Sequence, residues 1–141
     1  RQLHPDRVAA AALAAAAGEL LRFDQAAFAA AGPAAQMGDV GFVYVPPQCK
    51  AGSCGLHVAL HGCEQSVDKV SEAFVRDAGY NRWADAASMV VLYPQVSASL
   101  VPLNPKGCWD WWGYTGADYD LRTGAQLQFL ARILAALGVE T

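Results

Sequence analysis

Short apolar runs recur along the chain, and most of them stop at a glycine or a proline. Runs of about four to eight apolar or β-branched residues with such boundaries are typical of buried strands. Four segments fit this pattern: Leu20–Phe23, Gly41–Val45, Leu56–Leu60 and Met89–Tyr93. The third of them ends in the apolar run Val58–Leu60, and the turn His61-Gly62-Cys63 follows at once.

Longer segments place apolar residues near every third or fourth position, which predicts helices. These segments are residues 6–18, which are rich in alanine, residues 67–86, with a break near Gly79, and residues 121–137, with Gly138 as a candidate C-cap. A loop rich in Pro, Gly and Trp is expected over residues 96–117. No repeat or linker is visible, so one domain is expected over residues 1–141.

The helical segment between the third and fourth strands predicts a β-α-β unit. Two strands joined through a helix pair in parallel, so we expect an α/β fold with a mostly parallel sheet and flanking helices. Open parallel sheets place their sites at the carboxyl ends of the strands. Here those ends are His61-Gly62-Cys63 and Pro94-Gln95, and the tryptophan-rich loop follows the second. The pattern therefore predicts a functional site at this edge.

Composition and charge narrow the classes of partner. The chain has 141 residues, 54% of them hydrophobic, and a formal net charge of -3, which suffices for one domain with a core. It has no cluster of Lys and Arg, so nucleic acid is not expected as a partner. Its apolar runs stop short of the roughly 20 residues that cross a bilayer, so no membrane contact is expected. Because residue 1 is Arg, we expect that a targeting segment was removed or trimmed.

The chain contains four cysteines: Cys49, Cys54, Cys63 and Cys108. An even number, in a chain with loops rich in Gly and Pro, predicts two disulfides and an oxidising compartment, hence a secreted or periplasmic protein. Of the three possible connectivities we favour Cys49–Cys54 with Cys63–Cys108, and the second pair would tie the turn to the tryptophan-rich loop. Four free thiols are the alternative.

Cys49, Cys54, His57 and His61 have the spacing of a zinc finger, so a metal site has to be considered. His57 and His61 lie four residues apart on one predicted strand, which places them roughly 13 Å apart at about 3.3 Å per residue. One ion cannot bind both. We therefore expect no metal and no other cofactor, with His57 structural and His61 shaping the turn.

The turn after the third strand presents new backbone N–H groups at the mouth of the sheet, where they can bind negative charge. In hydrolases such groups stabilise the oxyanion of an ester under attack. The chain has no Gly-x-Ser-x-Gly, so the usual nucleophile elbow is missing. Ser66 has no adjacent glycine, and Cys63 could act as a nucleophile only outside a disulfide. The sequence therefore predicts the groups of an esterase site that stabilise negative charge, without its nucleophile.

Four aromatic residues stand within six positions of the expected loop: Trp109, Trp111, Trp112 and Tyr114. Core packing explains one or two of them, but three tryptophans in a glycine-bounded loop do not all face inward easily. We expect Trp111 and Trp112, ahead of Trp109, to contact an apolar substrate or a carbohydrate surface. Asp110 is expected to cap or bond the loop.

Five ordered blocks resemble the extracellular poly(3-hydroxybutyrate) (PHB) depolymerases. They are Gly41–Pro46, Leu56–Gln65, Gly79–Asp85, Val91–Gln95 and Gly107–Gly113. The resemblance runs from about Phe23 to the C-terminus and is closest to the type with a circularly permuted α/β-hydrolase fold. It implies a partial α/β-hydrolase fold and the hydrolysis of polyester chains to short hydroxyacid oligomers by a serine esterase.

The resemblance also implies roles for single residues. Cys63 matches the position whose backbone N–H forms part of the oxyanion hole, and Trp111 matches a tryptophan that lines the substrate cleft. Trp109, Trp112 and Gln65 lie in the same blocks and are further candidates for substrate contact. The serine, aspartate and histidine of the triad have no counterpart here. In the permuted type they would precede residue 1, and in the other type the serine would follow residue 141. The chain is thus expected to be the C-terminal portion of a depolymerase catalytic domain.

Our leading hypothesis is hydrolysis of PHB or a related polyester, with this chain supplying the oxyanion hole and the substrate cleft. A possible partner is then an upstream segment that carries the triad, and the chain alone is not expected to turn over an ester. A non-catalytic polyester-binding module and a structural half that needs a partner segment are the alternatives.

Overall fold

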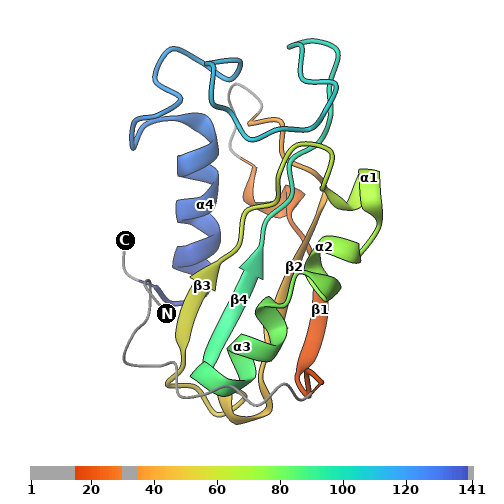
Figure 1. The fold of residues 1–141 in the computed structure, drawn as a ribbon. Helices are drawn as coiled ribbons and strands as arrows, with labels where there is room; N and C mark the ends of the chain where they lie inside the picture. Colours follow the sequence, from red (N-terminus) through yellow and green to blue (C-terminus); the bar gives the residue numbers. More distant parts are fainter. Residues whose placement is uncertain (1–14, 30–34, 140–141) are drawn as a thin grey trace.

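The computed structural model describes residues 15–29 and 35–139. A four-stranded sheet runs through the middle of this part of the chain (Figure 1), in the order β1-β2-β4-β3. The strands are β1 (Glu19–Asp24), β2 (Val40–Val45), β3 (Gly55–Val58) and β4 (Met89–Tyr93). Each of the four predicted strands is confirmed. The helix predicted over residues 6–18 falls mostly outside the described residues.

The sheet is mixed, so the prediction of a mostly parallel sheet is wrong. Strand β1 pairs antiparallel with β2, β2 pairs antiparallel with β4, and only β3 and β4 run in parallel. The β-α-β argument holds for that last pair, because helices lie between β3 and β4 in the chain. It does not extend to β1 and β2. Glu19 of β1 pairs with Val45 of β2 and Asp24 pairs with Val40, as in a hairpin.

Strand β3 ends earlier than predicted because of its neighbour. The predicted strand reached Leu60, but β3 closes at Val58 and one more backbone bond, from the Ala59 N–H to the Leu92 carbonyl, follows it. In this register the next bond would need an N–H at Pro94, which has none. Beyond that point the chain is free to turn away, and Leu60 is exposed.

Two apolar clusters cover the two faces of the sheet, as side chains alternate along the strands. Val91 and Tyr93 of β4 point toward the side of the helices that precede β4, while Leu92 points toward the C-terminal helix. The two clusters have these buried members: Phe42, Tyr44, Ala59, Val75, Ala84, Val91 and Tyr93 on one face, and Leu92, Phe129 and Ile133 on the other. The fold is therefore a sheet between two helical layers.

The first helical layer is broken twice. It consists of α1 (Val67–Val70), α2 (Ala73–Asp77) and α3 (Tyr80–Ala87). Ser71 after α1 and Gly79 before α3 have φ angles of 52° and 89°, in the left-handed region that no helix interior adopts. The predicted break near Gly79 is confirmed, and the break at Ser71 adds a second.

Helix α4 (Ala125–Ala136) forms the other layer and begins later than predicted. Its predecessor Gly124 is packed so closely that a Cβ there would lie 2.6 Å from the Tyr119 carbonyl oxygen. The chain before it is occupied by turns, including the bond from the Leu121 N–H to the Asp118 carbonyl. At the other end the C-cap is Leu137, one residue before the predicted Gly138. Gly138 follows it with a φ of 78°, and its N–H donates to the Ala135 carbonyl. The shorter elements are the 3-10 turns η2 (Ala26–Phe28) and η3 (Pro47–Cys49).

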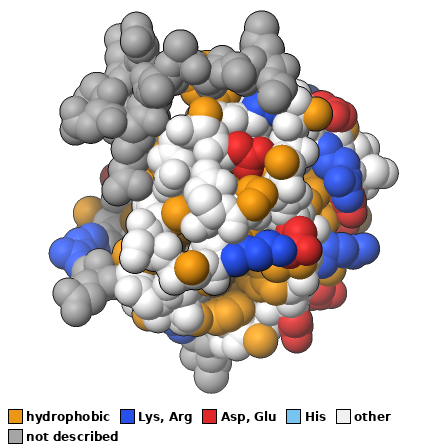
Figure 2. All heavy atoms as spheres, turned by 90° about the horizontal axis from the view of Figure 1, so that it is seen from below, with side chains coloured by type: hydrophobic (Ala, Val, Ile, Leu, Met, Phe, Trp, Pro, Cys, Tyr) orange, Lys and Arg blue, Asp and Glu red, His pale blue; other side chains and the backbone are white. Residues whose placement is uncertain are grey.

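The two ends of the molecule differ in character. The long loops gather at one end, beyond the carboxyl ends of β3 and β4 (Figure 1). Figure 2 shows the opposite end, where hydrophobic side chains are scattered and Lys or Arg side chains lie beside Asp or Glu side chains. Within residues 15–29 and 35–139, none of the helices combines the length and the apolar character needed to cross a membrane.

Candidate active-site turn and tryptophan loop

In the turn that follows β3, most backbone N–H groups donate hydrogen bonds to acceptors within the protein. The Gly62 N–H donates to Gln65 Oε1 at 2.9 Å, the Glu64 N–H to the Lys106 carbonyl at 2.7 Å, and the Gln65 N–H to the Gly62 carbonyl at 3.1 Å. Among the described residues, no acceptor lies within hydrogen-bond reach of the Cys63 N–H. Cys63 is also exposed. The Cys63 N–H is therefore a candidate donor to an external acceptor.

Glu64 has a left-handed backbone, with a φ of 60°. Such a residue between ordinary ones gives successive N–H groups a concave arrangement that suits anions. A Cβ at Gly62 would lie 2.8 Å from Gln65 Oε1, so glycine is needed for the Gln65 side chain to close the turn. Gln65 was predicted to contact substrate, and in the structure its carbonyl oxygen holds the turn.

His61 supports this turn from inside the molecule. It is buried, and its Nε2 accepts the Val96 N–H at 3.1 Å. The proton of the neutral ring then sits on Nδ1, which donates to the Gly62 carbonyl at 2.8 Å. Burial lowers the pKa of His61 below its ordinary value, and the bond to the Gly62 carbonyl opposes this only in part. These contacts agree with the predicted role of His61 in shaping the turn.

Two glutamines that the sequence did not single out join the turn region to the sheet. Gln25 and Gln95 are both buried. The Gln95 N–H donates to Gln25 Oε1 at 2.9 Å, and Gln25 Nε2 donates back to the Gln95 carbonyl at 2.7 Å. Gln95 Oε1 accepts the Val67 N–H at 2.8 Å and so fixes the start of α1. A polar residue directly after a buried strand was the available signal for Gln95, whereas no local pattern marks Gln25.

Both predicted disulfides are present. Cys49 is joined to Cys54, and Cys63 is joined to Cys108 with their Cα atoms 4.3 Å apart. The second bond ties the turn to the start of the tryptophan loop, as predicted. It also rules out Cys63 as a thiol nucleophile. Ser66 is fully buried, so the structure gives no support to it as a nucleophile either.

The tryptophan loop (residues 107–117) is organised by the carboxylate of Asp110, which accepts five hydrogen bonds of 2.6–3.1 Å. The donors are the N–H groups of Trp112, Gly113, Tyr114 and Thr115 and the hydroxyl of Thr115. Burial alone would raise the pKa of Asp110, but the hydrogen bonds outweigh it and the pKa lies below its ordinary value. The expectation that Asp110 bonds the loop is confirmed.

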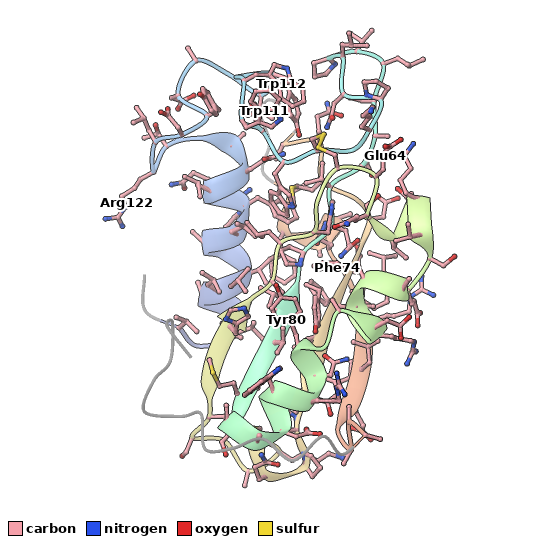
Figure 3. All side chains as sticks on the ribbon, in the orientation of Figure 1. Glu64, Phe74, Tyr80, Trp111, Trp112 and Arg122 are labelled. Atoms are coloured by element: carbon pink, nitrogen blue, oxygen red, sulfur yellow. A yellow bond between two sulfur atoms is a disulfide. The ribbon has the colours of Figure 1, made fainter. Side chains whose placement is uncertain are left out.

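The three tryptophans separate into two roles. Trp111 is 70% exposed and Trp112 is 42% exposed, and their rings meet edge to face at a centroid distance of 5.1 Å. Trp109 is half-buried and lies against His61, with ring centroids 5.9 Å apart. Trp111 and Trp112 occupy the same end of the molecule as Glu64 (Figure 3). The exposed pair can contact a ligand, while Trp109 backs the turn.

The four residues with zinc-finger spacing are engaged elsewhere. Cys49 and Cys54 are bonded to each other. The ring of His57 stacks on Tyr80 with centroids 5.5 Å apart, and His61 holds the turn. In the part of the chain that the structure describes, no group of three or more His, Cys, Asp or Glu side chains is arranged to hold a metal ion.

A mixed sheet with helices on both faces forms part of an α/β-hydrolase fold, as its likeness to solved PHB depolymerases shows. Residues 40–136 match the family described as esterase PHB depolymerase. The chain belongs to this family.

Curated relatives agree with this assignment. The chain is 47% identical to a poly(3-hydroxybutyrate) depolymerase of Delftia acidovorans, in a match that covers 64% of this chain and 18% of that protein. It is 42% identical to a polyhydroxybutyrate depolymerase of Talaromyces funiculosus, over 64% of this chain and 30% of that protein. The chain thus spans less than a third of either relative.

Solved structures agree as well. The crystal structure of PHB depolymerase from Penicillium funiculosum is 34% identical, with a TM-score of 0.79, over 94% of this chain and 45% of that one. A PHB depolymerase complexed with an R3HB trimer is 34% identical, with a TM-score of 0.78, over 91% of this chain and 43% of that one. The likeness covers nearly all of this chain and less than half of either structure.

Proposed function

We propose that this chain forms the oxyanion-binding and substrate-contacting part of a depolymerase that hydrolyses PHB or a related polyester. The observation that carries the proposal is the N–H of the exposed residue Cys63, which has no acceptor among the described residues although the N–H groups of Gly62, Glu64 and Gln65 all have one. A turn that leaves one amide unpaired in the middle of a bonded set is suited to bind a developing negative charge.

In this proposal the attacking hydroxyl belongs to a segment outside the sequence, because the 141 residues contain no Gly-x-Ser-x-Gly. As the hydroxyl gives its proton to the triad histidine, which also lies outside this chain, its oxygen adds to the ester carbonyl. The carbonyl electron pair moves onto the carbonyl oxygen, and the Cys63 N–H donates to that oxygen. Loss of one such donor typically costs roughly 3 kcal/mol of barrier. The turn therefore contributes to the rate without being sufficient for it.

The substrate assignment rests on the relatives, which are named as depolymerases of poly(3-hydroxybutyrate) or polyhydroxybutyrate, and on a related structure that holds an R3HB trimer. The Trp111–Trp112 pair supplies an apolar wall for the methyl and methylene groups of such an ester, and each indole N–H can donate to a carbonyl. Trp109 and Gln65 act behind this wall and hold the turn.

The test is turnover of p-nitrophenyl butyrate by the chain alone and after addition of the upstream portion of the Talaromyces funiculosus relative. We expect no rate above background for the chain alone and a rate sensitive to a serine-directed inhibitor for the mixture. An inhibitor-sensitive rate from the chain alone would overturn the assignment of the nucleophile to another segment.

A second candidate function is polyester binding without hydrolysis, which the exposed Trp111–Trp112 pair favours. Tryptophan fluorescence titration with a soluble 3-hydroxybutyrate trimer measures it. The Trp111→Ala and Trp112→Ala variants should each weaken binding about tenfold, with Trp83→Ala, which removes an exposed tryptophan of α3, as the matched control. Full binding by a chain that gains no activity from any upstream segment would favour the binding module.

Location and partners follow from the same features. Two disulfides and the likeness to a poly(3-hydroxybutyrate) depolymerase support an extracellular or periplasmic protein. Strand β3 pairs on only one side within the described residues, which supports docking of a further polypeptide segment there. Nucleic acid and membrane are not part of the proposal.

A further inference from the structure

Asn104 lies in the loop after β4 and uses its side-chain amide to hold the backbone of Cys108. Its Nδ2 donates to the Cys108 carbonyl, and its Oδ1 accepts the Cys108 N–H, both at 2.9 Å. Asn104 is 1% exposed, so water does not compete for these bonds. Because one buried amide pairs with both backbone groups of Cys108, it fixes the position and the orientation of that residue.

The Cys108 carbonyl has a second donor, the hydroxyl of Tyr114, at 2.7 Å. Tyr114 is held in turn, because its hydroxyl accepts a hydrogen bond from Gln126 Nε2 at 2.9 Å. Gln126 is buried and belongs to α4. Hydrogen bonds of two side chains therefore fix the Cys108 backbone, and the second of them is anchored on the C-terminal helix.

The segment of residues 106–108 holds the turn after β3 from outside and lies beside it (Figure 1). The Glu64 N–H donates to the Lys106 carbonyl at 2.7 Å. Cys63 is bonded to Cys108, and their Cα atoms are 4.3 Å apart. Because the disulfide is a short covalent link, a displacement of Cys108 displaces residue 63 as well.

The position of the Cys63 N–H decides what it can contribute to a reaction. A donor stabilises an oxyanion when it lies about 2.7–3.1 Å from the place where the charge develops, and a misplacement of about 1 Å can cost roughly a hundredfold in rate. The hydrogen bonds inside the turn join Gly62 and Gln65, on either side of residue 63. The position of the Cys63 N–H therefore depends on contacts that reach the turn from outside.

We propose that Asn104 is a positioning residue for ester hydrolysis. Through Cys108 and the Cys63–Cys108 disulfide, it sets the place from which the Cys63 N–H donates to the oxyanion. The inference rests on the proposed function for the role of that N–H, and Asn104 itself does not touch the ester. Loss of Asn104 should slow the chemical step and leave binding of the ester unchanged, because the oxyanion does not exist in the bound ester.

The first test observes the donor in the chain alone by NMR. In isotope-labelled protein, Asn104→Ala should shift the Cys63 amide signal and lower the order parameter of its N–H from about 0.85 toward about 0.6. The matched control is Asn81→Ala. Asn81 is also buried and also has two hydrogen bonds, to the Val75 carbonyl and from the Tyr93 hydroxyl, in the helical layer and β4. This control should lose comparable stability and keep the Cys63 amide unchanged.

The second test measures turnover of p-nitrophenyl butyrate by the chain mixed with the upstream portion of the Talaromyces funiculosus relative. We expect kcat of Asn104→Ala to fall about ten- to hundredfold, with KM within about twofold of the unmodified value. Tyr114→Phe removes only the second donor to Cys108 and should lower kcat about threefold. This milder variant replaces Asn104→Ala in both tests if the latter does not fold. Asn81→Ala should keep kcat.

Three results would overturn the inference. The first is an unchanged Cys63 amide in Asn104→Ala, or in Tyr114→Phe where that variant replaces it. The second is an equal response of this amide to Asn81→Ala, since the cause would then be lost stability alone. The third is a raised KM with kcat preserved, since Asn104 would then act on substrate binding. If the unmodified mixture shows no turnover, the proposed function fails, and the response of the Cys63 amide still decides whether Asn104 positions it.

Discussion

The imidazole of His61 is confined to one protonation state by its backbone neighbours. Nε2 must accept the Val96 N–H, so a second ring proton would place two donors against each other. Burial also lowers the pKa of His61 from its ordinary 6.5, since a charged ring there would lose its hydration. The residue therefore behaves as a fixed connection between the turn after β3 and the chain after β4.

This confinement predicts a pH dependence of stability. As the pH falls below about 6.5, the unfolded chain binds a proton at His61 that the folded chain does not yet bind. The contribution of neutral His61 to the free energy of unfolding should therefore be fully present above about pH 6.5. It should decrease as the pH falls toward the folded-state pKa of His61. Urea unfolding between about pH 5 and 7.5 measures the slope.

The His61→Asn variant provides the control, because its side chain does not titrate. At about pH 7.5 it should lose about 1–3 kcal/mol of stability, since the buried Val96 N–H has a poorer acceptor. Between about pH 5 and 6.5 its stability should change less with pH than that of the unmodified chain. An identical slope in both proteins would mean that other groups cause the dependence.

At the residue scale, the sequence predicted which region of the fold a side chain supports better than which residue it bonds to. The roles of His61 and Asp110 followed from their places at a strand end and inside a glycine-bounded loop. The pairing of Gln25 with Gln95, and the clamp of Asn104 on Cys108, could not be predicted. Both join residues through side-chain amides that leave no periodic pattern. Only folding brings Gln25 to Gln95, which lie 70 positions apart.

At the element scale, the tryptophan loop is held by a single carboxylate, that of Asp110. In the Asp110→Asn variant an amide NH₂ replaces one acceptor oxygen and faces N–H donors, so the variant should lose about 1–3 kcal/mol of stability. The near-UV circular dichroism of the indoles should weaken at the same time, because Trp111 and Trp112 lose their fixed orientation. Urea unfolding and circular dichroism measure the two effects.

Asp120→Asn is the matched control, because Asp120 is an exposed carboxylate shortly after the same loop. It should leave both the stability and the aromatic signal as they are. If Asp110→Asn behaves like this control, the loop is held by its other contacts, such as the bond from the Tyr114 hydroxyl to the Cys108 carbonyl.

Boundaries of elements were harder to predict than their existence. The strand β4 was predicted at its observed bounds, because its apolar run stops at Pro94. Strand β3 and helix α4 were predicted too long, since their limits depend on contacts with distant segments. Pro94 deprives β3 of a bonding partner, and the Tyr119 backbone leaves room only for glycine before α4.

At the scale of the whole molecule, strand direction was the main error. Alternating apolar residues show that a strand is buried but not which way its neighbour runs. The parallel prediction held where a helix joins the two strands and failed for β1 and β2, where the chain returns on itself. The predicted meeting of the turn after β3 with the loop after β4 is present, because these two strands are parallel neighbours and Cys63 is bonded to Cys108.

Because β3 pairs with a neighbour on only one side within the described residues, the hydrogen exchange rates of its amides should alternate from residue to residue. The Gly55 N–H donates to the Ser88 carbonyl just before β4, and the Ala59 N–H donates to the Leu92 carbonyl of β4. This alternation implies that the amides of Leu56 and Val58 point the other way. In deuterated water these two should exchange roughly a hundred times faster than the Ala59 amide. Central strand β4 should show no such alternation, and if Leu56 and Val58 become slow when an upstream segment is added, that segment has extended the sheet there.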